Sequence, residues 1–370
     1  MKLAVDCRMY GKSGIGSFLA GVLPYLCADE GFERILLLAG AADEAGTTAL
    51  AAAVTAYGDR VELVSCSVKP FSLRELLLFP RGITAQINAC DRYFTPYCNI
   101  PSGIRIPVYS TIHDLVFLDF PGLTGRAGVF VRKCLYHYAV FRSKALFTVS
   151  EFSRGRILAL LHCKKPVYVS CNGVPRFLEE AKRTGSLDGV KKADFVLFVG
   201  NIKAHKGLLT LLNAFPHFRE KTGAQLVIVG SAENFRTKDA ETERLLDAGG
   251  EGITFTGHVS DERLALLLSS ARLLVQPSLY EGFGIPPLEA LFCGTKAVIS
   301  DIPVFRDLYG AFPVTFFRAG DAADLAAKME SVWRDTNPLP PLPDTYSYAR
   351  AAAVITEQLK ACNERENPVI

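Results

Sequence analysis

The sequence predicts an α/β protein with two doubly wound domains, each built on a parallel sheet with helices on both faces. The chain has 370 residues, which is too long for one ordinary core and suits two domains of about 150–200 residues. Short apolar strands alternate with helical stretches in both halves. The segment Phe195–Gly200 is apolar throughout, as a strand buried on both faces of a sheet requires.

The composition of the chain predicts where the domains divide. We expect an N-terminal domain over residues 1–175 and a C-terminal domain over residues 176–345. The polar segment from Arg176 to Ala193 has the composition of a linker between them. Residues 346–370 follow the proline-rich stretch NPLPPLPD and contain a predicted helix, which need not pack on the second domain and can return to the first.

Composition and charge exclude several classes of protein. Charged residues make up 21% of the chain, so it is not disordered. No apolar run approaches the ~20 residues of a membrane span, and Asp6 and Arg8 interrupt the apolar start that a signal peptide needs. We therefore expect a cytoplasmic protein whose ten cysteines are reduced, since none forms a C-x-x-C pair. The net charge of +3 does not suggest a nucleic-acid partner.

Positive charge is concentrated in the N-terminal half. Through Gly173 there are 19 Lys and Arg against 13 Asp and Glu, whereas the remainder has 22 against 25. This balance favours an anionic acceptor or an anionic membrane surface, and ordinary surface charge is the alternative. The stretch from Arg126 to Lys144 mixes basic and apolar residues. It suits either contact with a bilayer or a helix packed within the first domain.

The segment PSLYEGFGIPPLEA, from Pro277 to Ala290, is the strongest candidate for a ligand site. A strand should end at Pro277 and a helix should start near Pro286, because proline suits a first helical turn. The loop between them places free N–H groups beside a helix N-terminus, which binds anions. Glu281 and Glu289 frame the loop, and carboxylates accept paired hydrogen bonds from vicinal hydroxyls. The pattern predicts a site in which one glutamate binds a hexose, the other binds a ribose, and a diphosphate lies between them. A turn with a purely structural role is the alternative.

A second candidate segment is FVGNIKAHKG, which places Lys203, His205 and Lys206 directly after a buried strand. The carboxyl edge of a parallel sheet is where open α/β folds bind ligands. Lys206 lies beside the start of the next helix, where it can neutralise a phosphate. A solvated lysine in a loop is the alternative.

The N-terminal half offers weaker signals. We expect GKSGIGS, after the first strand, to be a loop and a helix to run from about Phe18 to Cys27. This loop matches neither G-x-G-x-x-G nor G-x-x-x-x-G-K-[ST], although its glycines allow a ligand to approach the backbone. His113 ends the strand VYSTI at the ligand edge, and Asp114 can fix its ring; a structural histidine is the alternative.

No metal site is predicted. The chain has no D-x-D motif, and its six histidines are not paired at ligand spacing. We therefore expect Lys206 and helix N-termini to stabilise a diphosphate leaving group without a metal ion.

Together these segments resemble glycosyltransferase family 4, the retaining, group 1 glycosyltransferases of GT-B fold, over nearly the whole chain. The main match is EGFGIPPLE, from Glu281 to Glu289. Six further motifs support it: GNIxxxKG (Gly200–Gly207), GHVSD (Gly257–Asp261), TIHDL (Thr111–Leu115), TVSEFS (Thr148–Ser153), NGV (Asn172–Val174) and SGIG (Ser13–Gly16). The opening DxRM resembles a bacterial mannosyltransferase-like branch of the family.

The resemblance implies two Rossmann-like domains facing across a cleft, with the C-terminal helix crossing back to the first. It implies a catalytic set of Glu281 on the donor sugar hydroxyls, Lys206 on the diphosphate and His113 near the reacting sugar. It further implies that the donor is bound by Gly14, Gly16, Asn201, Lys206, Val259, Glu281, Gly282, Phe283, Gly284 and Glu289, the last of these on the ribose. Many family members carry Arg where this chain has Asn201, so Lys206 would need help from Lys203 or His205.

The implied reaction is transfer of a hexose from a nucleotide diphosphate sugar, with GDP-mannose as the first candidate. The acceptor would be a glycan or a lipid-linked glycan in bacterial polysaccharide or lipopolysaccharide assembly, at the inner face of the cell membrane. The nucleotide sugar is a substrate, so no cofactor is expected. A nucleotide-sugar epimerase or phosphorylase of the same fold and a catalytically inactive binding partner remain alternatives. A nicotinamide-dependent dehydrogenase is disfavoured by the missing G-x-G-x-x-G.

Overall fold

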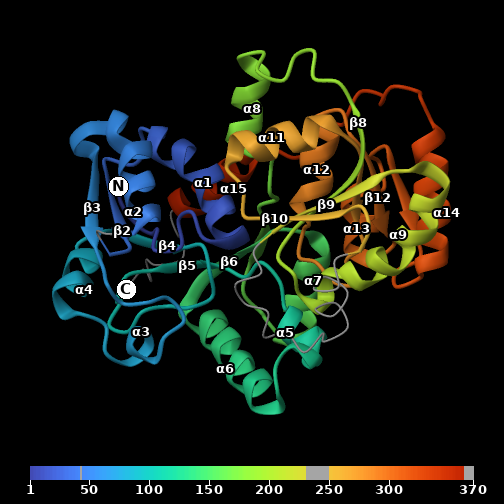
Figure 1. The fold of residues 1–370 in the computed structure, drawn as a ribbon. Coiled ribbons are helices and arrows are strands. Elements are labelled where there is room, and N and C mark those ends of the chain that lie inside the picture. The colour runs from blue at the N-terminus through green and yellow to red at the C-terminus, as the bar shows by residue number, and fades with distance from the viewer. Residues whose placement is uncertain (42–43, 231–249, 362–370) are drawn as a thin grey trace. The chain divides into compact units, whose positions relative to one another are not determined.

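The computed structural model describes residues 1–41, 44–230 and 250–361, which form two compact units (Figure 1). Unit 1 comprises Met1–Leu115, Phe130–Gly173 and the C-terminal segment from Tyr346. Unit 2 comprises Val116–Val129 and Val174–Thr345. The divisions at Gly173 and Tyr346 fall close to the expected limits, but the sequence did not predict that Val116–Val129 groups with unit 2.

Unit 1 is built on a parallel sheet with the strand order β3-β2-β1-β4-β5-β6-β7. Its central strands consist largely of buried apolar residues, as a sheet covered on both faces requires. The short strand β7 was not predicted, because three residues give no clear pattern. The strands are β1 (Lys2–Asp6), β2 (Arg34–Ala39), β3 (Val61–Ser65), β4 (Arg92–Thr95), β5 (Val108–Thr111), β6 (Ser143–Thr148) and β7 (Val167–Val169).

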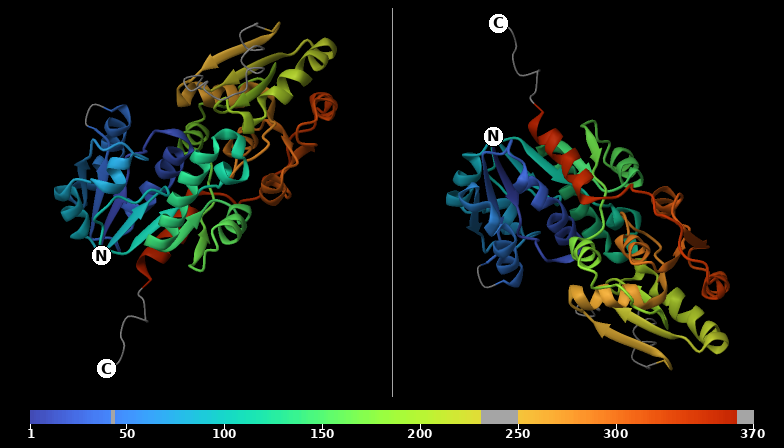
Figure 2. Two further views of the ribbon diagram at one scale, coloured as in Figure 1. Left: turned by 90° about the horizontal axis from the view of Figure 1, so that it is seen from below. Right: turned by 90° about the horizontal axis from the view of Figure 1, so that it is seen from above.

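Helices connect these strands, and the last helix of the chain also belongs to unit 1 (Figure 2). That helix, α15 (Tyr348–Lys360), packs on α1 (Ser13–Ala28). A Cβ atom at Gly21 would lie 2.3 Å from Cγ of Tyr348, so only a glycine admits the ring against α1. The other helices are α2 (Ala45–Val54), η1 (Thr55–Arg60), α3 (Leu73–Leu77), α4 (Arg81–Asn88), α6 (Arg126–Arg142), whose first turn groups with unit 2, and α7 (Glu151–Leu160).

The start of α1 corrects one expectation. The helix begins at Ser13 rather than near Phe18, so Gly14 and Gly16 lie in its first turn and not in a loop. A Cβ atom at Gly16 would lie 2.5 Å from the carbonyl oxygen of Met9. The missing side chain therefore lets the helix start directly against the preceding loop. Pro24 does not shorten the helix, which continues to Ala28.

Unit 2 is built on a parallel sheet with the strand order β10-β9-β8-β11-β12-β13. Its core includes Phe218 and Trp333, whose rings pack edge to face with their centroids 5.3 Å apart. The strands are β8 (Ala193–Val199), β9 (Gln225–Val229), β10 (Ile253–Gly257), β11 (Ala271–Gln276), β12 (Lys296–Ser300) and β13 (Val314–Phe317). The edge strand β13 was not predicted from the sequence.

The helices of unit 2 include one inside the expected linker. Pro175 precedes α8 (Arg176–Arg183), and Leu178 is its buried residue, so the polar stretch folds as an amphipathic helix and not as a free linker. The remaining helices are α5 (Val116–Asp119), η2 (Pro121–Leu123), η3 (Ala204–Lys206), α9 (Leu208–Thr222), α11 (Asp261–Ser270), α12 (Ile285–Phe292), α13 (Pro303–Tyr309) and α14 (Ala322–Arg334).

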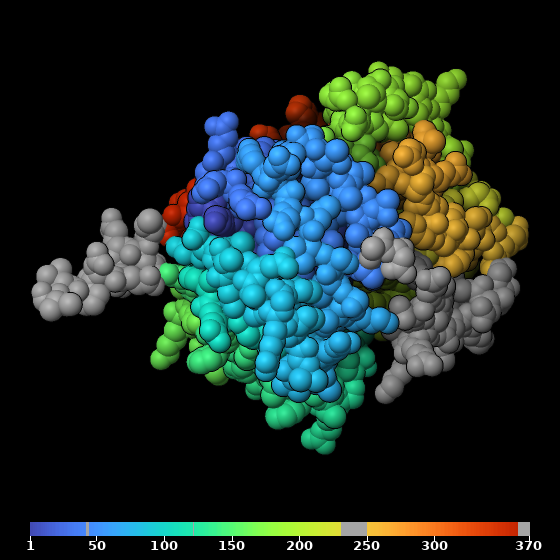
Figure 3. All heavy atoms as spheres, turned by 90° about the vertical axis from the view of Figure 1, so that its left-hand side faces the viewer, coloured from blue at the N-terminus to red at the C-terminus, as the bar shows by residue number. Residues whose placement is uncertain are grey.

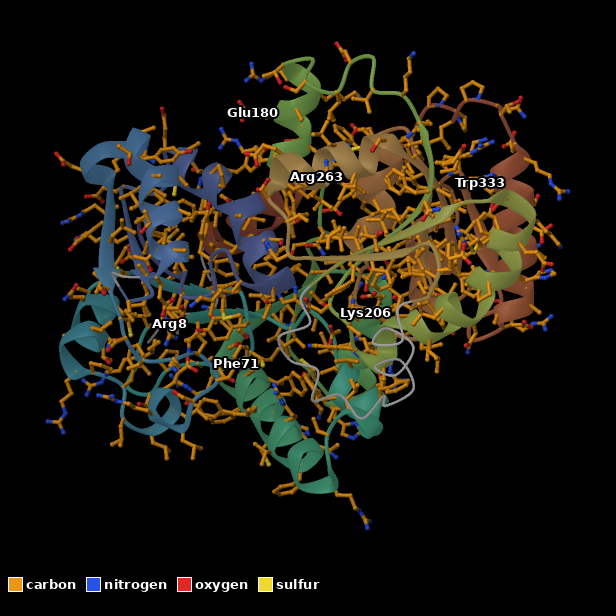
Figure 4. The ribbon with its side chains drawn as sticks, viewed as in Figure 1. Arg8, Phe71, Glu180, Lys206, Arg263 and Trp333 are labelled. Atoms are coloured by element: carbon orange, nitrogen blue, oxygen red, sulfur yellow. The ribbon has the colours of Figure 1, made fainter. Side chains whose placement is uncertain are left out.

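A buried ion network ties the first strand of unit 1 to α3 (Figure 4). Nη2 of Arg8 lies 2.6 Å from Oδ2 of Asp6 and 2.5 Å from Oε1 of Glu75, and all three side chains are at most 1% exposed. The hydroxyls of Tyr93 and Tyr97 each donate to Oδ2 of Asp6 at 2.8 Å. Burial alone would raise the pKa of Asp6, but Arg8 and these hydrogen bonds outweigh it and lower the pKa.

We predict that Arg8→Met destabilises the protein by about 3–5 kcal/mol, because it leaves two buried carboxylates without their cation. Urea unfolding followed by circular dichroism measures the change. The matched control is Arg34→Met, since Arg34 pairs with Glu62 at 3.0 Å but both side chains are at least half exposed. The control should cost less than about 1 kcal/mol; equal losses in the two variants would contradict the role given to the buried network.

Candidate active site

The candidate site lies at the carboxyl edge of the unit 2 sheet, where two neighbouring strands end. β8 ends at Val199 and leads through η3 into α9, and β11 ends at Gln276 and leads into α12. Because both strands are parallel, the two loops leave the sheet at the same edge. The structure therefore brings together the two segments that carried the strongest predictions.

The two loops are fixed to each other through their backbones. The carbonyl oxygen of His205 accepts hydrogen bonds from the N–H of Leu279 at 2.8 Å and of Tyr280 at 3.3 Å. Gly207 has a left-handed backbone (φ 66°), and a Cβ atom there would lie 1.9 Å from the carbonyl oxygen of Pro277. Only glycine permits both the conformation and the approach. The position of Lys206 is therefore set by the loop that carries Glu281.

Lys206 and Glu281 form the central ion pair of the site (Figure 4 labels Lys206). Nζ of Lys206 lies 2.7 Å from both carboxylate oxygens of Glu281, which is 6% exposed. The Ser278 hydroxyl donates to Oε1 of Glu281 at 2.8 Å, and Nε2 of Gln276 donates to the same oxygen at 3.4 Å. The carboxylate is therefore held in one orientation with its charge balanced.

Ser278 and Gln276 are residues of the site that the sequence reasoning missed. Both side chains are buried and both bond to Glu281. The available signal was Gln276 itself, a polar residue at the end of the otherwise largely apolar strand ARLLVQ. Tyr280 was also missed; its hydroxyl donates to Asp119 of α5 at 2.9 Å.

The loop from Gly282 to Gly284 leads into the N-terminus of α12, as predicted. Gly284 has a left-handed backbone (φ 78°), and its carbonyl oxygen accepts a hydrogen bond from the Tyr309 hydroxyl at 2.5 Å. Phe283 is buried, with its ring edge to face with that of Tyr309 at 6.4 Å. These contacts hold the loop backbone at the positive, N-terminal end of α12. Pro286 and Pro287 have no N–H, so among the first three helical residues only Ile285 can offer an N–H to an anion.

Glu289 lies in the second turn of α12 and is 7% exposed. Burial, together with the negative charge of Asp261, raises its pKa from 4.5 to about 7. Asp261 opens α11, two residues after Val259. The helices α11 and α12 are in contact, and Val259 lies in the loop that leads into α11.

The loop between β8 and η3 contains Asn201, the position at which many members of family 4 carry an arginine. Asn201 and Lys203 are exposed between β8 and η3. His205 is 8% exposed, and burial together with Lys206 and Lys203 lowers its pKa to about 3. A neutral His205 cannot assist Lys206 as a second cation, which removes one of the two residues expected to help it. Lys203 is the other.

His113, Gly14 and Gly16 belong to unit 1. Nε2 of His113 lies 2.8 Å from the carbonyl oxygen of Pro96. The ring of His113 packs edge to face on that of Phe18, with the ring centroids 5.1 Å apart. Burial lowers the pKa of His113 to about 4. Because a carbonyl oxygen only accepts, Nε2 must carry the proton and Nδ1 is left as an acceptor. His113 is thus a neutral, oriented group close to α1, the helix that starts with Gly14 and Gly16.

In the part of the chain that the structure describes, no three His, Cys, Asp or Glu residues are grouped so that they could hold a metal ion. Across the same residues, no helix is long and apolar enough to cross a membrane.

Sequence comparisons find similarity to a known family over the part of the chain that contains the candidate site. Residues 182–350 match the family model described as glycosyl transferases group 1. This part of the chain is therefore similar to group 1 glycosyltransferases, and the matched residues include Lys206, Glu281 and Glu289.

Curated relatives extend the similarity over part of their length. The chain is 27% identical over 225 residues to the O-antigen chain mannosyltransferase B of Escherichia coli, covering 59% of each protein. It is 37% identical over 225 residues to an uncharacterized glycosyltransferase of Methanocaldococcus jannaschii, with 58% of this chain and 57% of that protein covered. The matched regions thus span about three fifths of these relatives.

Solved structures share the fold of the whole chain. HepE of Anabaena, in complex with UDP and glucose, aligns with a TM-score of 0.64 over 97% of this chain and 95% of its own, at 16% identity. Sucrose-phosphate synthase of Thermosynechococcus elongatus aligns with a TM-score of 0.64 over 97% and 96%, at 17% identity. The expected GT-B fold, with two Rossmann-like domains, is confirmed.

We predict that Glu289→Gln stabilises the protein at alkaline pH. Because the folded protein holds the proton of Glu289 more tightly than the unfolded chain does, the free energy of unfolding falls as pH rises from 4.5, the unfolded pKa, through about 7, the folded pKa. Below pH 4.5 Glu289 causes no such loss. The variant removes this loss, so its free energy of unfolding at pH 8 should exceed that of the original protein by on the order of 3 kcal/mol.

Thermal unfolding between pH 4.5 and 8 measures this effect, and the advantage of the variant should vanish at the acid end. Glu251→Gln is the control, because the side chain of Glu251 is 89% exposed and should give no pH-dependent gain. A constant difference at every pH would show that Glu289 is not held with a raised pKa.

Proposed function

We propose that the protein is a retaining, family 4 glycosyltransferase that transfers a hexose from a nucleotide diphosphate sugar. The observation that carries the proposal is the pairing of Lys206 with Glu281 beside the N-terminus of α12, at the ligand edge of the unit 2 sheet. One cation, one oriented carboxylate and the positive end of a helix, with the N–H of Ile285, provide what a sugar diphosphate needs.

The proposed binding event exchanges the partners of the ion pair. The diphosphate takes Lys206 and the positive end of α12, where Ile285 supplies an N–H, and Glu281 then accepts hydrogen bonds from two hydroxyls of the sugar. Ser278 keeps the carboxylate oriented through its bond to Oε1. Glu289, once ionised, accepts hydrogen bonds from the two hydroxyls of the ribose. Val259 and its neighbours border the base.

The proposed reaction breaks the bond between the anomeric carbon and the diphosphate oxygen and forms a bond to an acceptor hydroxyl on the same face. The departing diphosphate takes the proton of that hydroxyl, so atoms and charge balance. Lys206, with Lys203 as a second cation in place of an arginine at Asn201, stabilises the charge on the leaving group without a metal ion. His113, with Nδ1 as an acceptor, would orient a sugar hydroxyl.

We further propose mannose as the sugar and a glycan or lipid-linked glycan as the acceptor, with the enzyme working in the cytoplasm at the inner membrane face. The proposal is supported by the names of two similar proteins, the O-antigen chain mannosyltransferases of Escherichia coli and Salmonella typhimurium. The latter is 26% identical over 202 residues, covering 54% of this chain and 53% of its own length. UDP-glucose is the competing donor, because HepE was solved with UDP and glucose.

We predict that Glu281→Ala and Lys206→Ala each lower turnover at least about 100-fold, because each removes charge stabilisation or positioning from the transition state. Initial rates of sugar transfer measure the loss. Lys221→Ala is the matched control: its ammonium lies 2.6 Å from Glu330, but the pair joins α9 to α14 away from the sheet edge. Turnover of the control should stay within about twofold. Near-normal turnover in either site variant would remove that residue from the mechanism.

We predict that one class of nucleotide sugar raises the unfolding temperature and that a chelator does not abolish the shift. A ligand at ~100 times its dissociation constant adds about 2.7 kcal/mol to the free energy of unfolding. Differential scanning fluorimetry with GDP-, UDP-, ADP- and dTDP-sugars, each with and without EDTA, measures it. A shift that needs a divalent metal would contradict the metal-free mechanism, and no shift with any donor would favour an inactive binding partner. Nucleotide release without a transfer product would instead favour an epimerase or a hydrolase.

A further inference from the structure

The α3 segment of unit 1 exposes an unusual amount of apolar surface. Leu73, Leu77 and Leu78 are 74%, 70% and 74% exposed, and Phe71 just before the helix is 39% exposed. Leu73 and Leu77 are four residues apart and share one face of α3. Single exposed leucines are common on proteins, but several within one short segment mark a contact surface.

The charges around this surface have one sign. Lys69, Arg74 and Arg81 are all exposed in the same segment. The only carboxylate from Cys66 to Cys90 is Glu75, and it is fully buried against Arg8. The outer face of the segment is therefore apolar and basic, without an acidic residue of its own.

Internal contacts hold the leucines outward. Oε2 of Glu75 accepts hydrogen bonds from the N–H of Phe71 and from Nδ2 of Asn99, each at 2.8 Å. The Ser72 hydroxyl caps α3 by accepting the N–H of Glu75 at 3.2 Å. Because Glu75 and its partners fix the inner side of this short helix, the side chains on its other side have no freedom to fold inward.

The helix α6 also exposes apolar and basic side chains. Phe130 and Phe141 are 68% and 76% exposed, and Arg126 and Lys133 are exposed on the same helix. No Asp or Glu occurs between Phe120 and Ser150. Tyr138 and Ala139 of α6 pack on the same core cluster as Phe79, which follows α3. Figure 3 shows α3, in light blue, and α6, in teal, toward the same lower end of unit 1.

We propose that this surface docks the protein on a bilayer that contains anionic phospholipids. The docking surface consists of apolar residues of α3 and α6 with basic residues among them: Phe71, Leu73, Leu77, Leu78, Phe130 and Phe141, with Lys69, Arg74, Arg81 and Lys133. Apolar side chains enter the interface of a bilayer, and the surrounding Lys and Arg pair with its anionic headgroups. The cations favour an anionic occupant, and the leucines and phenylalanines that are 68–76% exposed favour one with an apolar interior. An anionic bilayer combines the two properties.

Membrane docking would bring the protein to a lipid-linked acceptor, so its biological role rests on the acceptor proposed above. Binding to vesicles is measured without donor or acceptor, so its failure is distinguishable from a failure of sugar transfer. None of the docking residues belongs to the candidate active site.

The experiment is flotation of the purified chain with vesicles of phosphatidylcholine, with and without phosphatidylglycerol. We expect the protein to float with the anionic vesicles and not with the neutral ones, and to be released as ionic strength rises from about 0.1 M to 0.5 M. The variant Leu73→Ser/Leu77→Ser/Leu78→Ser should bind anionic vesicles at least about tenfold more weakly. Arg74→Glu/Arg81→Glu should also weaken binding and leave little dependence on salt.

Two controls are matched to these variants. Leu266→Ser alters a leucine that is 41% exposed on α11, and Arg183→Glu alters an arginine on α8 whose side chain is 72% exposed. Both should bind vesicles as the original protein does, and an unchanged unfolding temperature shows that each variant folds. No flotation of the original protein, or equal flotation of the leucine variant, overturns the proposal. A dimer in sedimentation equilibrium that the leucine variant loses, without flotation, would assign the surface to a second copy and also overturn it.

Discussion

The contact between two loop backbones at Gly207 and Pro277 is the constraint on which the candidate site depends. The loops follow neighbouring parallel strands, so their approach is a consequence of the sheet. Gly207 has no side chain and takes a left-handed conformation, which lets the loop that carries Lys206 approach the carbonyl oxygen of Pro277. The pair of Lys206 with Glu281 then needs no further element to hold it. Backbone geometry, rather than the attraction between the charges, determines where this ion pair lies.

The two glutamates that frame the α12 loop have different environments and therefore suit different tasks. Glu281 is surrounded by donors, from Lys206 and Ser278, and its carboxylate has a fixed orientation. Glu289 is buried near the negative charge of Asp261, and its pKa rises to about 7. A carboxylate that is compensated within the protein can exchange one partner for another at little cost. One that lacks compensation gains most from a ligand that donates hydrogen bonds.

The sequence predicted the fold and the central site because both rest on local patterns. Apolar strands and the glutamate-bearing loop are continuous in the chain, so Glu281 and Lys206 could be placed on one sheet edge. The grouping of Val116–Val129 with unit 2 depends on tertiary contacts and has no local pattern. The neutral state of His205 could not be predicted either, since it depends on burial and on two neighbouring lysines. The early start of α1 depends on one close backbone contact, at Gly16.

The network around Arg8 links the interior of unit 1 to its surface. Glu75 belongs to a helix of five residues, which is too short to be stable by itself. Its carboxylate pairs with Arg8 and also accepts the N–H of Phe71, so one buried side chain fixes both the helix and the chain that enters it. Replacing this ion pair by apolar residues of similar size could preserve stability. It would not reproduce the bond to Phe71, which holds the chain that enters the helix bearing the exposed Leu73 and Leu77. The buried charges therefore specify a surface as well as stabilising a core.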